Sequence, residues 1–115
     1  MQNQLKNKFG LTERDMQTIR DIFVKYPEVE KVFLFGSRAK GNFKQGSDID
    51  LSVMNAGVND ISIRGLHADF EESSLPYRVE LVNFPALNSP EFVAHIERVG
   101  ILFYDRTKAL RNFSS

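Results

Sequence analysis

Apolar side chains recur along this chain in two rhythms, one typical of helices and the other of strands. From residue 12 to residue 26 they return every three or four positions, at Met16, Ile19, Ile22, Phe23 and Tyr26. That spacing puts them on one face of a helix, which Thr12 would cap and Pro27 would stop. The pattern therefore predicts a first amphipathic helix over residues 12–26.

Two later segments show the same helical rhythm. Residues 60–74 place three apolar side chains on one face: Ile63, Leu66 and Phe70. Ser89 followed by Pro90 is typical of a helix start, because serine caps well and proline suits the first helical position. Gly100 marks the end of that helix. We therefore expect two further helices, over residues 60–74 and 89–99.

Four shorter segments carry the strand pattern. They cover residues 32–35, 47–54, 77–83 and 101–104. Each is rich in apolar or β-branched residues and ends near a turn signal. Strands that alternate with helices in this way predict an α/β domain (α+β), in which helices cover a mixed sheet of about four strands.

The strand over residues 47–54 separates acidic side chains from apolar ones, because alternate residues of a strand face opposite ways. The apolar set is Ile49, Leu51 and Val53, and the set expected on the exposed face is Asp48, Asp50 and Ser52. The two carboxylates then share a face at a Cα separation of roughly 6.5 Å, two strand steps. Carboxylates this close repel each other unless a cation lies between them, and Mg²⁺ prefers oxygen ligands of this kind.

A basic, glycine-containing turn lies between the first two strands. Gly36 leaves room for a phosphate to approach the backbone, and Ser37 offers a hydroxyl and an amide at the start of a helical turn. Three cations follow, with no acid among residues 37–47: Arg38, Lys40 and Lys44. These residues predict a polyphosphate site, although a solvated loop position fits Lys40 and Lys44 equally well.

A third carboxylate would complete a two-metal site. Glu80 is the best candidate, because it lies on the polar face of the strand over 77–83. It would hold a metal ion and draw a proton from an attacking hydroxyl. A surface ion pair between Glu80 and Arg78, its neighbour on the same face, fits the sequence as an alternative.

The spacing of these residues carries a resemblance to a known family. Gly36-Ser37, ten intervening residues and then Asp48-Ile49-Asp50 resemble the signature of the polymerase β-like nucleotidyltransferase superfamily. In its small size the chain resembles the minimal nucleotidyltransferase branch, whose members are often antitoxins of HEPN/MNT toxin–antitoxin pairs. The resemblance implies the polymerase β-like nucleotidyltransferase fold.

The resemblance also implies a role for each motif residue. Phosphate positioning falls on Gly36 and Ser37, with Arg38 beside them. Catalysis and Mg²⁺ binding fall on three acids: Asp48, Asp50 and Glu80. The chain departs from the family pattern at the third acid, which is more commonly aspartate.

For activity, the resemblance implies transfer of AMP from ATP to a hydroxyl, namely a tyrosine of a partner HEPN toxin. The protein would thereby act as an antitoxin. Two alternatives stay open at this point: a toxin-binding module whose catalytic residues are slow or unused, and a nucleotidyltransferase subunit that acts on another acceptor. The chain has no room for a second recognition domain, so we expect a partner subunit or a second copy to complete the cleft.

Composition narrows the class of protein. A chain of 115 residues with 42% hydrophobic content supports a single domain over 1–115. We expect its ends, 1–10 and 106–115, to fray. The net charge is zero and there is no cysteine, which excludes a strong nucleic-acid field, disulfides and thiolate sites. Neither a secretion signal nor a membrane span is recognisable, so we expect a soluble, cytoplasmic protein.

Overall fold

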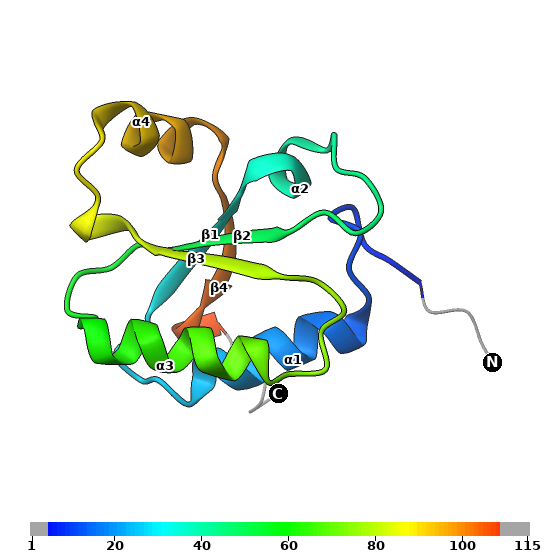
Figure 1. The fold of residues 1–115 in the computed structure, drawn as a ribbon, viewed down its shortest axis with the longest axis horizontal. Helices are drawn as coiled ribbons and strands as arrows, with labels where there is room; N and C mark the ends of the chain where they lie inside the picture. Colours follow the sequence, from blue (N-terminus) through cyan, green and yellow to red (C-terminus); the bar gives the residue numbers. More distant parts are fainter. Residues whose placement is uncertain (1–4, 109–115) are drawn as a thin grey trace.

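The strand segments form a single sheet. The computed structural model describes residues 5–108. Its strands are β1 (Lys31–Phe35), β2 (Ile49–Val53), β3 (Val79–Asn83) and β4 (Ile101–Asp105). They lie in the order β3-β2-β1-β4, with β2 parallel to β3 and β1 antiparallel to both β2 and β4. The prediction of a mixed sheet is therefore confirmed, and Figure 1 shows it crossing the middle of the molecule.

The helices fall into two groups. The longer pair, α1 (Glu13–Val24) and α3 (Asp60–Glu71), lies together below the strands in Figure 1. The short α2 (Gly36–Lys40) and α4 (Pro90–Val99) lie above, and a 3-10 turn, η1 (Phe84–Ala86), leads from β3 toward α4. The strands therefore have a side covered by α1 and α3, and a second side near which, among the described residues, α2 and α4 lie.

The predicted helix starts carry the expected caps. At α1, the Asp15 amide donates to Thr12 Oγ1 and the Thr12 amide donates to Asp15 Oδ2, both at 3.0 Å. At α4, the Phe92 amide donates to Ser89 Oγ at 3.2 Å. Each cap satisfies backbone donors that a helix leaves unpaired at its first turn.

The core lies between the sheet and the α1–α3 pair. The ring of Phe23 on α1 packs edge-on against that of Phe70 on α3, with centroids 5.4 Å apart. From β2, the whole apolar set of the sequence pattern is fully buried: Ile49, Leu51 and Val53. Burial of each such side chain contributes about 1.5–3 kcal/mol of stabilisation, so this face of the sheet holds the fold together.

The opposite face of β2 differs from the sequence prediction at Ser52. We expected an exposed side chain, but Ser52 has no exposed surface. Its strand is central, and its register neighbours are Phe33 of β1 and Val82 of β3. Alternation predicts which face a side chain takes, but neighbouring strands decide whether that face is covered.

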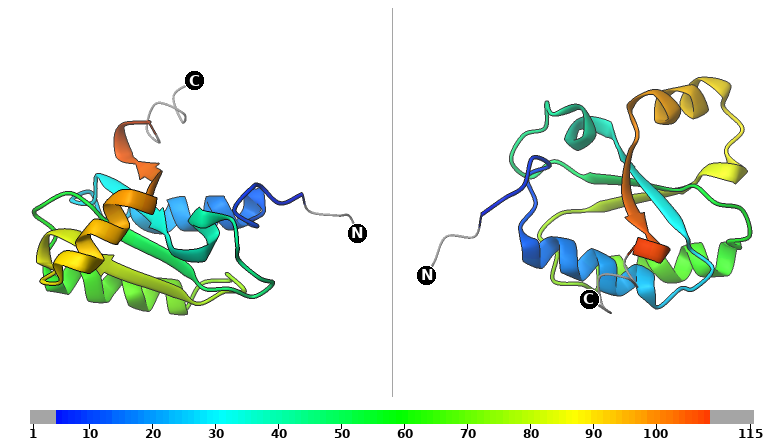
Figure 2. Two further views of the ribbon diagram at one scale, coloured as in Figure 1. Left: turned by 90° about the horizontal axis from the view of Figure 1, so that it is seen from above. Right: turned by 180° about the vertical axis from the view of Figure 1, so that it is seen from behind.

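The N-terminal segment is tied to the fold from Asn7 onward. The amide of Asn7 donates to the Leu11 carbonyl at 2.8 Å, and the rings of Phe9 and Phe103 pack edge-on. Both views in Figure 2 show this segment beside α2 and the loop that follows. Residues 1–4 and 109–115 of the ends expected to fray lie outside the described residues. Between residues 5 and 108, no helix is both long enough and apolar enough to cross a membrane.

Candidate active site

The two strands that carry the predicted acids lie next to each other. In the parallel pair β2–β3, Asp50 is the register partner of Glu80. Asp48 immediately precedes β2 and is exposed. On the other side of β2, Asp50 is the register partner of Phe35, after which α2 begins at Gly36. Register partners share a face, so Asp50 and Glu80 are neighbours beside the glycine turn.

Crowding of negative charge changes the chemistry of Asp50. Its pKa is raised to about 6, first by burial of the carboxyl group and then by the charges of Asp48 and Glu80, while the charge of Arg38 acts in the opposite direction. A carboxylate in this environment gains from a bound cation, which relieves both the repulsion and the loss of hydration. The three acids therefore form one electrostatic unit.

Gly36 fits closely under this carboxylate. It takes a left-handed φ of +74°, which costs glycine little and other residues more. A Cβ atom built on Gly36 would also collide with the carboxylate of Asp50. Two requirements thus select glycine here, the backbone conformation and the contact with Asp50. Ser37 follows in the first turn of α2 and is half-buried.

The structure gives Arg38 a role that the sequence did not indicate. We expected a phosphate contact, but its guanidinium points into the protein and only 2% of the residue is exposed. Nη2 donates to the Ser47 carbonyl at 2.7 Å, and Nη1 donates to the Phe9 carbonyl at 2.8 Å. The guanidinium also lies over the rings of Phe43 and Tyr77, 5.1 and 4.3 Å from their centroids. Arg38 therefore joins the N-terminal segment, the basic turn and the approach to β3.

The two lysines of the turn are both exposed. Lys40 lies in α2, followed by Gly41 in the left-handed conformation, and Lys44 lies in the loop before β2. Neither makes an ion pair within residues 5–108. Both side chains are exposed, and the phosphate contact of Lys40 stays a prediction.

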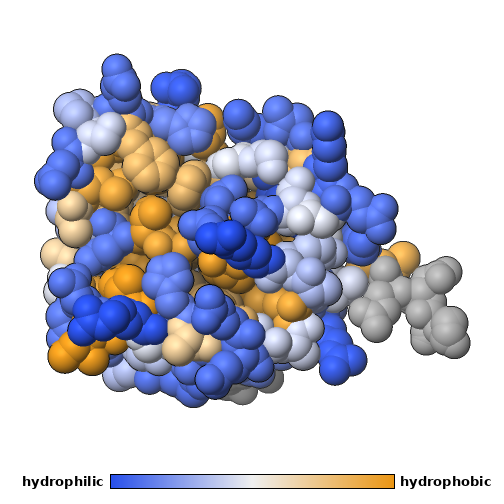
Figure 3. Space-filling view, in the orientation of Figure 1, coloured by the Kyte–Doolittle hydropathy of each residue, from blue (hydrophilic) through white to orange (hydrophobic). Residues whose placement is uncertain are grey.

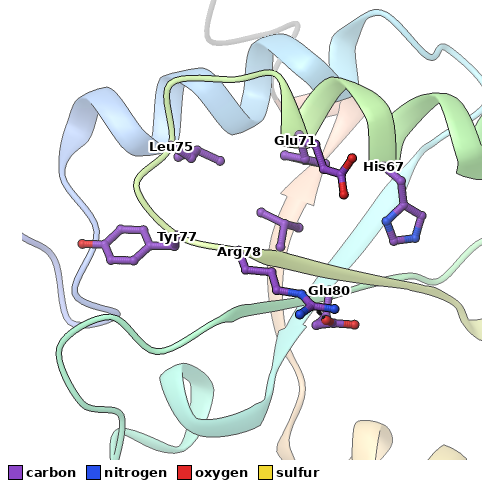
Figure 4. A pocket seen from close by; sticks show the side chains of 8 residues that line it. His67, Glu71, Leu75, Tyr77, Arg78 and Glu80 are labelled. Atoms are coloured by element: carbon purple, nitrogen blue, oxygen red, sulfur yellow. Dashed lines mark ion pairs between the residues drawn. The ribbon is translucent and has the colours of Figure 1, made fainter.

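Glu80 is already engaged by a cation. Arg78 Nε lies 2.8 Å from Glu80 Oε2, so the surface ion pair that the sequence left open as an alternative is present. Figure 4 shows the Arg78 side chain reaching over the Glu80 carboxylate, at the edge of a cavity between α3 and β3. The cavity has a volume of about 300 Å³, and His67 and Glu71 of α3 line it together with Arg78 and Glu80. The sequence does not reveal this cavity, because it depends on how α3 packs beside β3.

Comparison with known proteins identifies the family. The sequence model described as "Polymerase beta, Nucleotidyltransferase" matches residues 17–109, which include all four strands and the motif. The chain belongs to this family. A relative within it is the probable protein adenylyltransferase MntA of Haemophilus influenzae, 36% identical over 80 residues, or 69% of this chain and 69% of that protein.

Solved structures share the nucleotidyltransferase fold. A crystal structure of a toxin–antitoxin with AMP-PNP has a TM-score of 0.65 at 23% identity and covers 86% of this chain and 80% of that chain. The tri-AMPylated Shewanella oneidensis HEPN toxin in complex with MNT antitoxin has a TM-score of 0.54 at 21% identity, covering 85% and 79%. These similarities confirm the predicted polymerase β-like fold.

Nucleotidyltransferase chemistry usually employs divalent metal ions, and the donor set of this chain suits one. Asp48, Asp50 and Glu80 offer only carboxylate oxygens, the ligands preferred by Mg²⁺, and burial together with the charges of the other two acids raises the pKa of Asp50. Within residues 5–108, however, no three acidic or histidine side chains are close enough to hold a metal ion as they stand. Glu80 lies against Arg78 instead. The residue types fit Mg²⁺, provided that the Glu80 side chain turns away from Arg78.

Proposed function

We propose that this protein transfers AMP from ATP to a hydroxyl group of a partner protein, a tyrosine of a HEPN-type toxin, and so acts as an antitoxin in the cytoplasm. The observation that carries the proposal is the acidic unit of Asp48, Asp50 and Glu80 beside the Gly36 turn. The name of the Haemophilus influenzae relative supports adenylyl transfer. The AMPylated HEPN toxin among the fold neighbours supports the acceptor class.

Each residue of the unit has a task in this reaction. Asp48 and Asp50 would hold Mg²⁺, with Glu80 as the third ligand, and the ion neutralises charge on the triphosphate when it is bound. Gly36, Ser37 and Lys40 would position the phosphates. Arg38 serves them indirectly, because its hydrogen bonds to the Ser47 and Asp48 carbonyls fix the start of β2.

The proposed transfer balances as a displacement at the α-phosphorus of ATP. A bond forms from the acceptor oxygen to that phosphorus, and the bond to the pyrophosphate oxygen breaks. The acceptor proton passes to the Glu80 carboxylate, which neighbours Asp50 in register. Arg78 engages Glu80 Oε2, so release of this pair would free that oxygen to accept the proton.

The test is transfer of label from α-labelled ATP to the candidate toxin in the presence of Mg²⁺. Label should reach the toxin with the unchanged protein, and Asp48→Asn and Asp50→Asn should each remove it. Asp21→Asn is a matched control, because Asp21 is exposed on α1 and hydrogen-bonded only to Gln17. Toxin neutralisation that survives both motif substitutions, without label, would favour simple binding over catalysis.

A further inference from the structure

The ion pair between Arg78 and Glu80 stands apart from the other two ion pairs of the described residues. The Arg20–Glu13 pair lies along α1, and the Lys25–Asp69 pair joins α1 to α3. Only Arg78 pairs with an acid of the proposed active site. Because of this placement, the pair can affect how the proposed active site binds a metal ion.

Arg78 meets the carboxylate in a geometry that competes with a metal ion. Its Nε lies 2.8 Å from Glu80 Oε2, a direct contact between the guanidinium and the carboxylate. A carboxylate oxygen engaged in this way is less available to a divalent cation.

The pair is weak enough to open. The Arg78 side chain is 75% exposed and that of Glu80 is 42% exposed, and exposed ion pairs contribute little stability because water screens them. Arg78 has no further ion-pair partner among residues 5–108. Arg78 lines the cavity between α3 and β3, and Figure 4 shows its side chain extended from the strand toward Glu80.

We propose that Arg78 is a positioning residue, an internal counter-ion that holds Glu80 out of the metal site until metal and nucleotide arrive. This inference rests on the proposed function, because it assumes that Glu80 completes the site. Arg78 then weakens binding of metal alone. The metal site would therefore stay largely empty in the absence of nucleotide. Glu80 would join Asp50 as a ligand only when a cation displaces the Arg78 guanidinium from it.

The test is a titration of the nucleotide-free protein with Mn²⁺. Binding is measured from the decrease in the electron paramagnetic resonance signal of free Mn²⁺. Arg78→Gln should bind Mn²⁺ about two- to fivefold more tightly than the unchanged protein, the range expected for loss of one exposed pair. Arg78→Lys keeps the charge but loses the planar guanidinium that contacts Glu80, so its Mn²⁺ affinity should fall between those of the other two proteins. Lys25→Gln, which breaks the remote pair with Asp69, should leave Mn²⁺ affinity unchanged.

A double-mutant cycle separates this role from a general charge effect. In the Glu80→Gln background the second substitution Arg78→Gln should change Mn²⁺ affinity by less than about 1.5-fold, because the carboxylate that Arg78 holds is gone. Equal tightening in both backgrounds, or no tightening in Arg78→Gln alone, would overturn the proposal. Failure of the proposed function looks different: Mn²⁺ affinity would then be indifferent to Asp50→Asn.

Discussion

The two faces of the sheet are built from the same strands and serve opposite purposes. On the face toward α1 and α3, the β2 side chains Ile49, Leu51 and Val53 are fully buried in the apolar core. On the other face the same strand presents Asp50, next to Glu80 of β3, in an environment that raises the pKa of Asp50 to about 6. One face lowers the free energy of the folded state, while the other keeps like charges together.

The comparison shows how a small domain can carry chemistry. Because the side-chain period of a strand is two, adjacent residues of β2 lie in different environments without any change of backbone. The core on one side holds the register that brings Asp50 beside Glu80. Figure 3 shows the resulting mixed surface, with apolar area exposed between α4 and β3 and hydrophilic side chains around it. Substitutions on the two faces should therefore differ in kind.

The largest effect on activity is expected at Asp50. Asp50→Asn keeps the size of the side chain but removes the negative charge, so AMP transfer should fall by about 10³-fold, the scale seen when a central electrostatic group is lost. Far-ultraviolet circular dichroism should be unchanged. A variant that keeps more than a tenth of the activity would remove Asp50 from the site.

Leu51 is the matching position on the other face. Leu51→Ala leaves a cavity in the core and should lower the free energy of unfolding by about 2–5 kcal/mol, measured by urea denaturation. Folded Leu51→Ala protein at low temperature should retain transfer activity within about threefold. A loss of activity as large as that of Asp50→Asn, in protein that is still folded, would contradict the division between the faces.

Gly36 couples the turn to the acid. Gly36→Ala puts a Cβ atom against the Asp50 carboxylate and strains a left-handed residue, so we expect a loss of about 1–3 kcal/mol in stability. Transfer should fall about 10²-fold, because Asp50 would be displaced by a fraction of an ångström or more. Steady-state kinetics and thermal denaturation of the same preparation check both outcomes. Gly57→Ala offers a control with positive φ and open space around the new Cβ.

Arg38 tests the corrected role. Because its guanidinium bonds to backbone carbonyls of two segments, at Phe9 and at Ser47, Arg38→Met should cost about 2–4 kcal/mol in stability, through loss of charge-assisted hydrogen bonds and unpaired buried carbonyls. Lys40→Met should instead weaken ATP binding with little change in stability. Denaturation and nucleotide titration of both variants check this. If Arg38→Met weakened ATP binding without loss of stability, Arg38 would be the phosphate contact after all.

The last expected effect is a pH dependence of stability, which concerns the metal-free protein. Because the pKa of Asp50 is raised from 3.8 to about 6, the folded protein holds a proton that the unfolded chain has released between these values. The raised pKa therefore costs stability above pH 6, and the cost disappears below about pH 4. In metal-free buffer Asp50→Asn should melt higher than the unchanged protein at pH 8 and match it at pH 4. If the two melting temperatures differed equally at both pH values, the raised pKa of Asp50 would not be the cause.

Much of this architecture follows from local pattern. The apolar rhythm predicted α1, α3 and α4, and alternation predicted which face of β2 joins the core. The environment of side chains on the polar face was harder to predict. Burial of Ser52 depends on its neighbours in β1 and β3, and Arg38 bonds to Phe9 and stacks on Tyr77. Nothing in the sequence around Arg38 indicates that each of its three guanidinium nitrogens will donate to a backbone carbonyl of another segment. Tertiary contacts decide whether such a side chain is buried in the fold or available to a ligand.

The most direct test of the account is calorimetric titration of AMP-PNP into the protein with and without Mg²⁺. Binding should require Mg²⁺, and Asp50→Asn should abolish it. Leu51→Ala, held folded at low temperature, should still bind the nucleotide. Nucleotide binding of equal strength without the metal, or in Asp50→Asn, would contradict the claim that the acidic face of the sheet is a metal-dependent nucleotide site.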